Sequence, residues 1–173
     1  NRYRLNDYSD KVLDYCYEHR LPLAMEILDI DFFKQYNDNY GHQQGDECII
    51  AIADELKKME DGQTFCARYG GDEFIIIYAG ISAEEVHAKA AALRQNIMDL
   101  KLEHLYSNAL PIVTISQGIS YGVPEEGNRS WDFLHTADML LYQVKKRSRN
   151  DICIADIRGQ ELDLSSKQEK VEP

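Results

Sequence analysis

Residues 65–78 read FCARYGGDEFIIIY, with a strand-like run on each side of a pair of glycines. Gly70 and Gly71 predict a tight hairpin, because glycine adopts positive φ at little cost and two-residue connections join antiparallel strands. Two acids, Asp72 and Glu73, follow this turn directly. Side chains that leave a tight turn are accessible to a ligand, which makes Asp72 and Glu73 candidate functional residues.

A second acidic site lies upstream. Residues 23–30, LAMEILDI, form a mostly apolar run with the length of a buried strand, followed by Asp31. Asp29 would meet the hairpin acids if the two strands are neighbours. Clustered oxygen ligands suit Mg²⁺ or Mn²⁺ and predict phosphoryl or nucleotidyl transfer. Asp31 could join them, since residues i and i+2 share a strand face, but each acid alone could equally be a turn cap or a solvated strand end.

Hydrophobic periodicity and turn residues predict the other elements of the fold. Helices are expected at residues 7–19, 46–59, 82–100 and 130–147, strands at 112–121 and 151–154, and a loop at 37–41. The helix after Ser82 opens with a capping box that ends at Glu85. This order of elements indicates an α+β fold, a mixed α/β sandwich in which helices flank a central sheet.

The composition is that of one globular domain. The 173 residues are 44% hydrophobic and 28% charged, and no stretch approaches the roughly 20 apolar residues of a membrane-spanning helix. A net charge of -11 argues against binding to nucleic acid or to anionic membranes, because such binding rests on cationic contacts with phosphates. A phosphate-bearing ligand must therefore be held locally, by metal ions and a few basic groups. The four cysteines form no Cys-x-x-Cys pair and are expected to be reduced thiols.

Four motifs together resemble the GGDEF family, the catalytic domain of diguanylate cyclases. Residues 68–74 contain the family signature, and residues 29–34, DIDFFK, resemble its Asp-x-Asp-x-Phe-Lys strand end. Residues 37–46, NDNYGHQQGD, resemble its Asn-Asp-x-x-Gly-His-x-x-Gly-Asp motif, and residues 137–150 resemble its closing helix. The resemblance implies a five-stranded central sheet flanked by helices, similar to nucleotide cyclase and polymerase palm cores. Residues 1–155 would form this domain, and 156–173 a polar tail or linker.

The resemblance implies a metal site and catalytic groups. Asp29 and Asp72 would bind Mg²⁺ or Mn²⁺, with the Ile30 carbonyl as a further ligand and two ions per nucleotide site. Asp72 or Glu73 would also lie near the attacking ribose hydroxyl. The candidate catalytic residues are Asp72, Glu73 and Lys34.

The resemblance also implies a GTP site. Asn37 and Asp46 match the guanine readers, and a carboxylate can accept hydrogen bonds from the guanine N1 and N2 donors, a pair that adenine lacks. Lys145 and Arg149 are four residues apart, so on one helix both could point at a single phosphate, although a basic helix C-terminus is the competing interpretation. The residues that match the triphosphate site, by side chain or backbone, are Phe32, Phe33, Lys34, Gly70, Gly71, Lys145 and Arg149.

The reaction implied is attack by the 3′-hydroxyl of one GTP on the α-phosphorus of another, giving cyclic di-GMP and pyrophosphate. Each subunit of a homodimer would bring one GTP. Residues 61–64, DGQT, stand where many relatives carry an inhibitory Arg-x-x-Asp product site, so we expect no high-affinity product inhibition there. The chain opens with residues that resemble those just after the family's Asp-x-Leu-Thr segment. We therefore expect a missing N-terminal sensory domain and a cytoplasmic location, without direct membrane contact by this domain.

Two other interpretations stay open. A GGDEF-like domain without catalysis could be a GTP sensor or a docking module, although the complete motifs favour an enzyme. A purely structural α+β domain would bind no nucleotide. Trp131 is expected in the core. Four histidines without a partner at metal-ligand spacing are expected at the surface or the core edge, namely His19, His87, His104 and His135.

Overall fold

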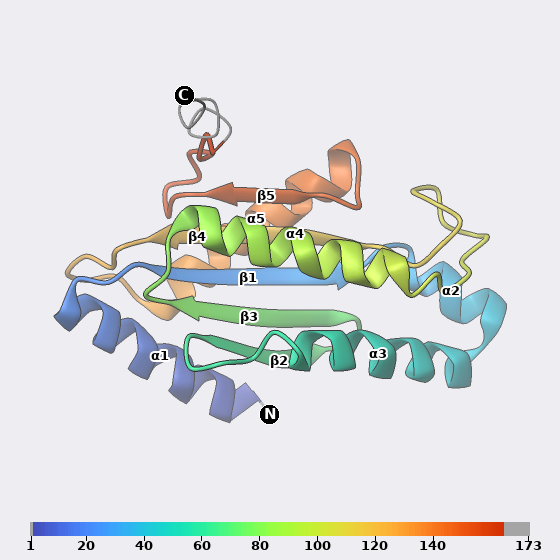
Figure 1. Cartoon of the computed structure of the whole chain (residues 1–173), viewed down its shortest axis with the longest axis horizontal. Coiled ribbons are helices and arrows are strands. Elements are labelled where there is room, and N and C mark those ends of the chain that lie inside the picture. The colour runs from blue at the N-terminus through green and yellow to red at the C-terminus, as the bar shows by residue number, and fades with distance from the viewer. Residues whose placement is uncertain (1, 165–173) are drawn as a thin grey trace, which may run out of the picture.

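A computed structural model describes residues 2–164 as five helices and one five-stranded sheet (Figure 1). The helices are α1 (Arg2–His19), α2 (Phe33–Tyr40), α3 (His42–Lys57), α4 (Ala83–Asp99) and α5 (Ser130–Arg147). The strands are β1 (Leu23–Ile30), β2 (Thr64–Gly70), β3 (Glu73–Ala79), β4 (Ile115–Gly122) and β5 (Ile152–Ala155). They lie in the order β2-β3-β1-β4-β5, and only the β4–β5 pair is parallel. The expected α+β fold is confirmed.

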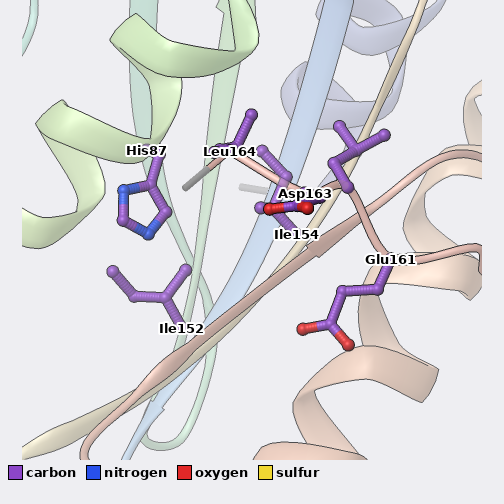
Figure 2. Close-up of a pocket in the computed structure, with 7 residues that line it drawn as sticks. His87, Ile152, Ile154, Glu161, Asp163 and Leu164 are labelled. Carbon is purple, nitrogen blue, oxygen red and sulfur yellow. The ribbon is translucent and has the colours of Figure 1, made fainter. Parts of the chain in front are cut away.

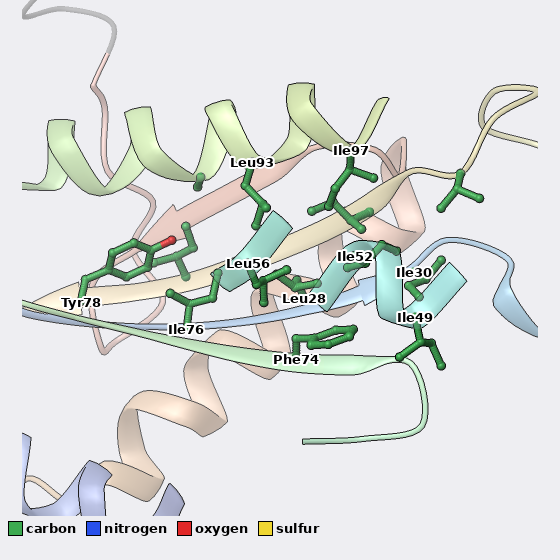
Figure 3. Packing of buried hydrophobic residues seen from close by; sticks show 14 of the residues in the cluster. Leu28, Ile30, Ile49, Ile52, Leu56, Phe74, Ile76, Tyr78, Leu93 and Ile97 are labelled. Carbon is green, nitrogen blue, oxygen red and sulfur yellow. The ribbon is translucent and has the colours of Figure 1, made fainter. Parts of the chain in front are cut away.

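Helices cover both faces of the sheet because β1 and β3 are apolar on both sides. Leu28 of β1 packs with Phe74 of β3 against α3 and α4, as Figure 3 shows. Ile27, the preceding residue, points to the opposite face and packs with Ile75 among residues of α1 and α5. Strand β1 is therefore the centre of the core, and its carboxyl end is held rigidly between two neighbouring strands.

A glycine brings α5 close to the sheet. A Cβ atom built on Gly118 of β4 would lie 2.3 Å from the backbone oxygen of Ala137 and from the backbone nitrogen of Leu141. Only a residue without a side chain allows this approach. The close contact fixes the position of α5, whose last turn carries Lys145.

The sequence and the structure differ mainly at residues 37–41. The expected loop is helical as far as Tyr40, because Phe33 and Tyr36 lie on one face of α2 and are buried in the core. Gly41, at φ +91, alone separates α2 from α3. Helix α3 consequently begins at His42 rather than at Asp46. The predicted hairpin is confirmed, and Ser82 caps α4 as expected by accepting a hydrogen bond from the Glu85 amide.

The segment after β5 folds back on the sheet. The Leu162 amide donates to the carbonyl of Ile154 at 3.0 Å, and Leu162 and Leu164 pack against the main core. A groove of about 550 Å³ lies between this segment, β5 and His87 of α4 (Figure 2). Residues 165–173, part of the expected tail, lie outside the described residues. Within residues 2–164, no helix is long and apolar enough to cross a membrane.

Trp131 is a wrong prediction. Its side chain is 58% exposed at the start of α5, where it stacks on His135 with ring centroids 4.7 Å apart. The inward positions of this helix are taken by Phe133, Ala137 and Leu141. Helical spacing alone therefore placed Trp131 on the wrong face.

Candidate active site

The two acidic sites meet at one end of the sheet, because β1 and β3 are antiparallel neighbours. Asp29 is paired directly with Glu73, and the Ile30 amide donates to the carbonyl of Asp72 at 3.3 Å. Asp72 lies in the turn between β2 and β3, just after Gly71, which has φ +53. Asp29, Asp72 and Glu73 thus all lie where β1 ends and β3 begins.

Asp29 is a buried carboxylate that needs a cation. It is 5% exposed, and the Lys145 ammonium from α5 donates a hydrogen bond to its Oδ2. Burial raises the pKa of Asp29 to about 7, the hydrogen bond and charge of Lys145 oppose this shift, and the charges of Asp72 and Asp31 add to it. Burial also raises the pKa of Glu73, against the charge of Lys145. The cluster therefore favours any further positive charge placed beside it.

Asp31 does not join the carboxylate cluster, contrary to the possibility raised by its spacing from Asp29. Its side chain is fully buried and accepts hydrogen bonds from Ser116 Oγ at 2.5 Å and Thr114 Oγ1 at 2.7 Å. It also accepts from the Asn150 amide at 3.0 Å. These bonds occupy both oxygens, so Asp31 ties the end of β1 to β4 and to the turn that follows α5.

The second expected cation, Arg149, lies beyond the end of α5. The helix stops at Arg147, and the amides of Ser148 and Arg149 both donate to the carbonyl of Val144. Arg149 then adopts a left-handed conformation at φ 53, so the expected helical i, i+4 relation to Lys145 is wrong. Both cations still reach the end of β1. The Arg149 guanidinium lies 4.1 Å from the centroid of the Phe32 ring and 3.8 Å from Asp31.

A cavity of about 330 Å³ lies beside the carboxylate cluster. It brings together five of the expected site residues from α2 and the hairpin turn, and two that sequence reasoning did not single out, Asp38 and His42. Asp38, within the motif at residues 37–46, forms an ion pair at 3.2 Å with Lys34, the last residue of the motif at residues 29–34. The expected residues that line the cavity are Phe33, Lys34, Asn37, Gly71 and Asp72.

Asn37 lies at the contact between α2 and α3. Its Oδ1 is buried and has no hydrogen-bond partner among the described residues. A Cβ atom on Gly45 would lie 1.8 Å from this oxygen, so only glycine at position 45 leaves the amide in place. Asp46, the next residue, is exposed on α3, just after its first turn. The two expected guanine readers thus come from adjacent helices that meet at Gly41.

The hairpin turn is braced by a residue that the sequence motif contains but that we did not predict to be functional. Arg68 donates through Nε and Nη2 to the carbonyl of Gly71, at 3.0 and 2.8 Å. A two-pronged bond of this kind fixes the orientation of a peptide group. It therefore helps to define where Asp72 leaves the turn.

The donor set fits a hard divalent cation. Within residues 2–164 there is no cluster of three histidine, cysteine, aspartate or glutamate side chains with metal-binding geometry. Asp29, Asp72 and the carbonyl of Ile30 offer oxygen atoms alone. Mg²⁺ is commonly held by one or two carboxylates together with the phosphates of its substrate, so this incomplete set suits a metal that arrives with a nucleotide.

Comparison with known proteins agrees with this geometry. The family described as "Diguanylate cyclase, GGDEF domain" matches residues 1–151. The chain belongs to the GGDEF family. It is 36% identical to the probable diguanylate cyclase DgcC of Escherichia coli (strain K12) over 140 residues, covering 79% of this chain and 36% of DgcC. Diguanylate cyclase A of Treponema denticola is 34% identical over 139 residues, covering 80% of this chain and 36% of that protein. This GGDEF chain therefore spans little more than a third of these relatives.

Solved GGDEF structures share the fold. The GGDEF domain of DgcB from Caulobacter crescentus, in complex with c-di-GMP, has a TM-score of 0.80 and 30% identity, and the match covers 89% of this chain and 87% of that one. The active GGEEF domain of a diguanylate cyclase from Vibrio cholerae has a TM-score of 0.76 and 29% identity, covering 89% and 96% of the two chains. The order of elements and the sheet are thus those of the family.

Proposed function

We propose that this protein is a diguanylate cyclase that joins two GTP molecules into cyclic di-GMP with release of two pyrophosphates. The observation that carries the proposal is the meeting of Asp29, Asp72 and Glu73 with Lys145, beside a cavity lined by Lys34 and Asn37. Oxygen ligands, cations and a base-sized cavity are together what metal-assisted nucleotidyl transfer requires. Membership of a family whose members include named diguanylate cyclases supports the same reaction.

Asp29, Asp72 and the Ile30 carbonyl would hold Mg²⁺ or Mn²⁺, two ions per nucleotide site. When bound, the ions would stabilise the charge on the attacking and leaving oxygens. Lys145 favours the charged form of Asp29 against the effect of burial, and it would contact phosphate oxygens at the same edge. Glu73, paired with Asp29, would accept a hydrogen bond from the attacking 3′-hydroxyl, and Lys34 would neutralise charge on the pyrophosphate as it leaves.

The base would be read where α2 meets α3. Asn37 presents a buried oxygen that has no partner within residues 2–164, and such an atom is costly to leave unpaired unless a ligand donates to it. Asp46 can accept from the N1 and N2 donors of guanine, a pair that adenine does not offer. The triphosphate would lie against the first amides of α2, at Phe33 and Lys34, with Arg149 beside Phe32.

Each domain would supply one GTP, and a two-fold homodimer would face the nucleotides toward each other. Control of such pairing by a sensory domain, and a cytoplasmic location, would complete this proposal. Residues 1–155 would form the catalytic domain. Product inhibition through residues 61–64 is not expected, because Asp61 and Thr64 stand where the Arg-x-x-Asp product site has its arginine and aspartate.

Pyrophosphate release from GTP and Mg²⁺ tests the proposal, with Asp72→Ala as the inactive control. A cyclase releases pyrophosphate in the wild type and not in the variant. Tight Mg²⁺-dependent GTP binding without release would instead indicate a GTP sensor or docking module. Absence of nucleotide binding would indicate a structural domain.

A further inference from the structure

We infer that His104 is a positioning residue for the phosphate-binding turn, and this inference rests on the proposed function. His104 lies in the segment between α4 and β4, which runs beside α2 (Figure 1). Its side chain has no exposed surface, although its spacing predicted a surface or core-edge role. Its Nε2 lies 2.9 Å from the carbonyl oxygen of Phe32. A carbonyl oxygen only accepts, so Nε2 carries the hydrogen and donates.

The imidazole is held in this orientation by its surroundings. Its ring packs edge-on against Tyr36, with centroids 5.2 Å apart and planes at 84°. The backbone on each side is pinned, because the His104 amide donates to the carbonyl of Pro111 and the Val113 amide donates to that of Leu102. Among the described residues Nδ1 has no hydrogen-bond partner, so a hydrogen there would be buried without an acceptor. The ring is therefore fixed with its Nε2 hydrogen directed at the Phe32 carbonyl.

Phe32 has a backbone conformation that needs such support. It is the residue before α2 and lies in the left-handed region, at φ 54 and ψ 38, which is unfavourable for a residue with a side chain. Its carbonyl accepts from the Tyr36 amide at 3.0 Å as well as from His104. The Arg149 guanidinium lies over its ring. The two hydrogen bonds hold the carbonyl of Phe32, and the Arg149 contact holds its side chain.

The orientation of this peptide group determines where an amide hydrogen points. The bond between Phe32 and Phe33 is planar and trans, so the Phe32 C=O and the Phe33 N–H point in opposite directions. The hydrogen bond from His104 holds the Phe32 carbonyl toward the imidazole, so the Phe33 N–H points away from His104. Phe33 is the first residue of α2, so its amide lies before the first intrahelical hydrogen bond and is free to donate to a ligand. Phe33 also lines the cavity together with Lys34 and Asp72.

His104 would therefore act on the triphosphate and not on the base. Without its hydrogen bond, the Phe32 carbonyl would keep only the bond from the Tyr36 amide, and the Phe33 amide would be held less firmly toward a phosphate oxygen. The guanine readers are Asn37, in the second turn of α2, and Asp46 of α3, and their positions depend on the contact between these two helices and not on the Phe32 carbonyl. The consequence is a selective loss of affinity for the phosphorylated nucleotide.

Two variants separate the hydrogen bond from the packing. His104→Phe keeps a ring against Tyr36 but removes the donor, and His104→Gln keeps an N–H donor at a similar reach. We expect His104→Phe to bind GTP with Mg²⁺ about tenfold more weakly, as for a lost amide–phosphate bond, with guanosine affinity unchanged. His104→Gln should stay within about threefold of the wild type. His87→Phe, in the groove of Figure 2, is the matched control and should bind like the wild type.

Unchanged GTP affinity in His104→Phe, or equal losses for GTP and guanosine, would overturn the inference. A second readout needs neither nucleotide nor a folded variant. The ¹⁵N spectrum of the wild-type protein should show His104 with a hydrogen on Nε2, and a ring with its hydrogen on Nδ1 alone would overturn the inference even in a protein that binds GTP well. A wild type that binds no GTP, but has the expected tautomer, would refute the proposed function and leave the Phe32 contact as a structural bond only.

Discussion

Gly45→Ala is expected to damage guanine recognition without unfolding the protein. The new Cβ atom would lie 1.8 Å from Asn37 Oδ1 and 2.9 Å from its Cγ, whereas real Cβ contacts do not come below 3.0 Å. The amide of Asn37 must therefore move by more than about 1 Å, which is enough to break a hydrogen bond that depends on its position. We expect GTP to bind about tenfold more weakly, or about 1.4 kcal/mol, which is the scale of one hydrogen bond lost at a buried oxygen.

The same substitution has opposing effects on stability. Alanine in place of glycine in a helix raises the free energy of unfolding by up to about 1 kcal/mol, and crowding at a buried contact lowers it by a similar amount. We therefore expect the free energy of unfolding to change by less than about 1 kcal/mol. Gly62→Ala is the matched control, because a Cβ atom there meets nothing within 4 Å. That variant should bind GTP like the wild type.

Isothermal titration with GTP and Mg²⁺ measures the effect, and a double-mutant cycle with Asn37→Ala tests its cause. If Gly45 acts by leaving room for Asn37, Gly45→Ala should add less than a twofold loss in the Asn37→Ala background. Wild-type affinity in Gly45→Ala, or the same tenfold loss in both backgrounds, would refute the reasoning.

Three further predictions concern other buried or charged groups. Burial raises the pKa of Glu26 from 4.5 to about 7, against the hydrogen bond from Tyr78. The folded state therefore binds a proton that the unfolded state has lost, and the free energy of unfolding should fall as the pH rises from about 4.5 to 7. Glu26→Gln should remove this slope and raise the free energy of unfolding at pH 8 by up to about 3 kcal/mol in denaturant titrations. Asp31→Asn should lower the free energy of unfolding by about 2 kcal/mol and leave the Mg²⁺ concentration for half-maximal GTP binding unchanged, whereas a metal ligand would raise it several-fold. Asp61→Ala should leave inhibition by cyclic di-GMP as in the wild type; relief of strong inhibition would show that residues 61–64 bind product after all.

Local sequence signals were enough for the sheet and the hairpin. Gly70 and Gly71 predicted the turn, and the apolar run from Leu23 to Ile30 predicted β1, which is buried along its whole length because both faces of the sheet are covered. The α2 helix was missed because Asn and Asp at positions 37–39 have loop propensity, while the burial of Tyr36 that stabilises the helix depends on the rest of the fold. Tertiary packing outweighed propensity there.

The site was predictable in its members but not in its arrangement. The acids and cations follow from the motifs. Spacing could not show, however, that the carboxylate of Asp31 accepts hydrogen bonds from Ser116 and Thr114, which lie more than eighty residues away. Nor could it show that Arg149 leaves α5 through a left-handed turn. The contact of His104 with Phe32 has no sequence signal at all, because it joins a loop to a backbone carbonyl 72 residues away.

The most direct test of the account is identification by mass of the product formed from GTP and Mg²⁺ across a range of protein concentrations. The account predicts cyclic di-GMP, formed with a steeper than linear dependence on protein concentration, because two domains must meet for each turnover. The Asp72→Ala variant should form none. Failure to form a cyclic dinucleotide at high protein concentration, in a protein that binds GTP tightly with Mg²⁺, would contradict the account and leave this GGDEF domain as a nucleotide sensor.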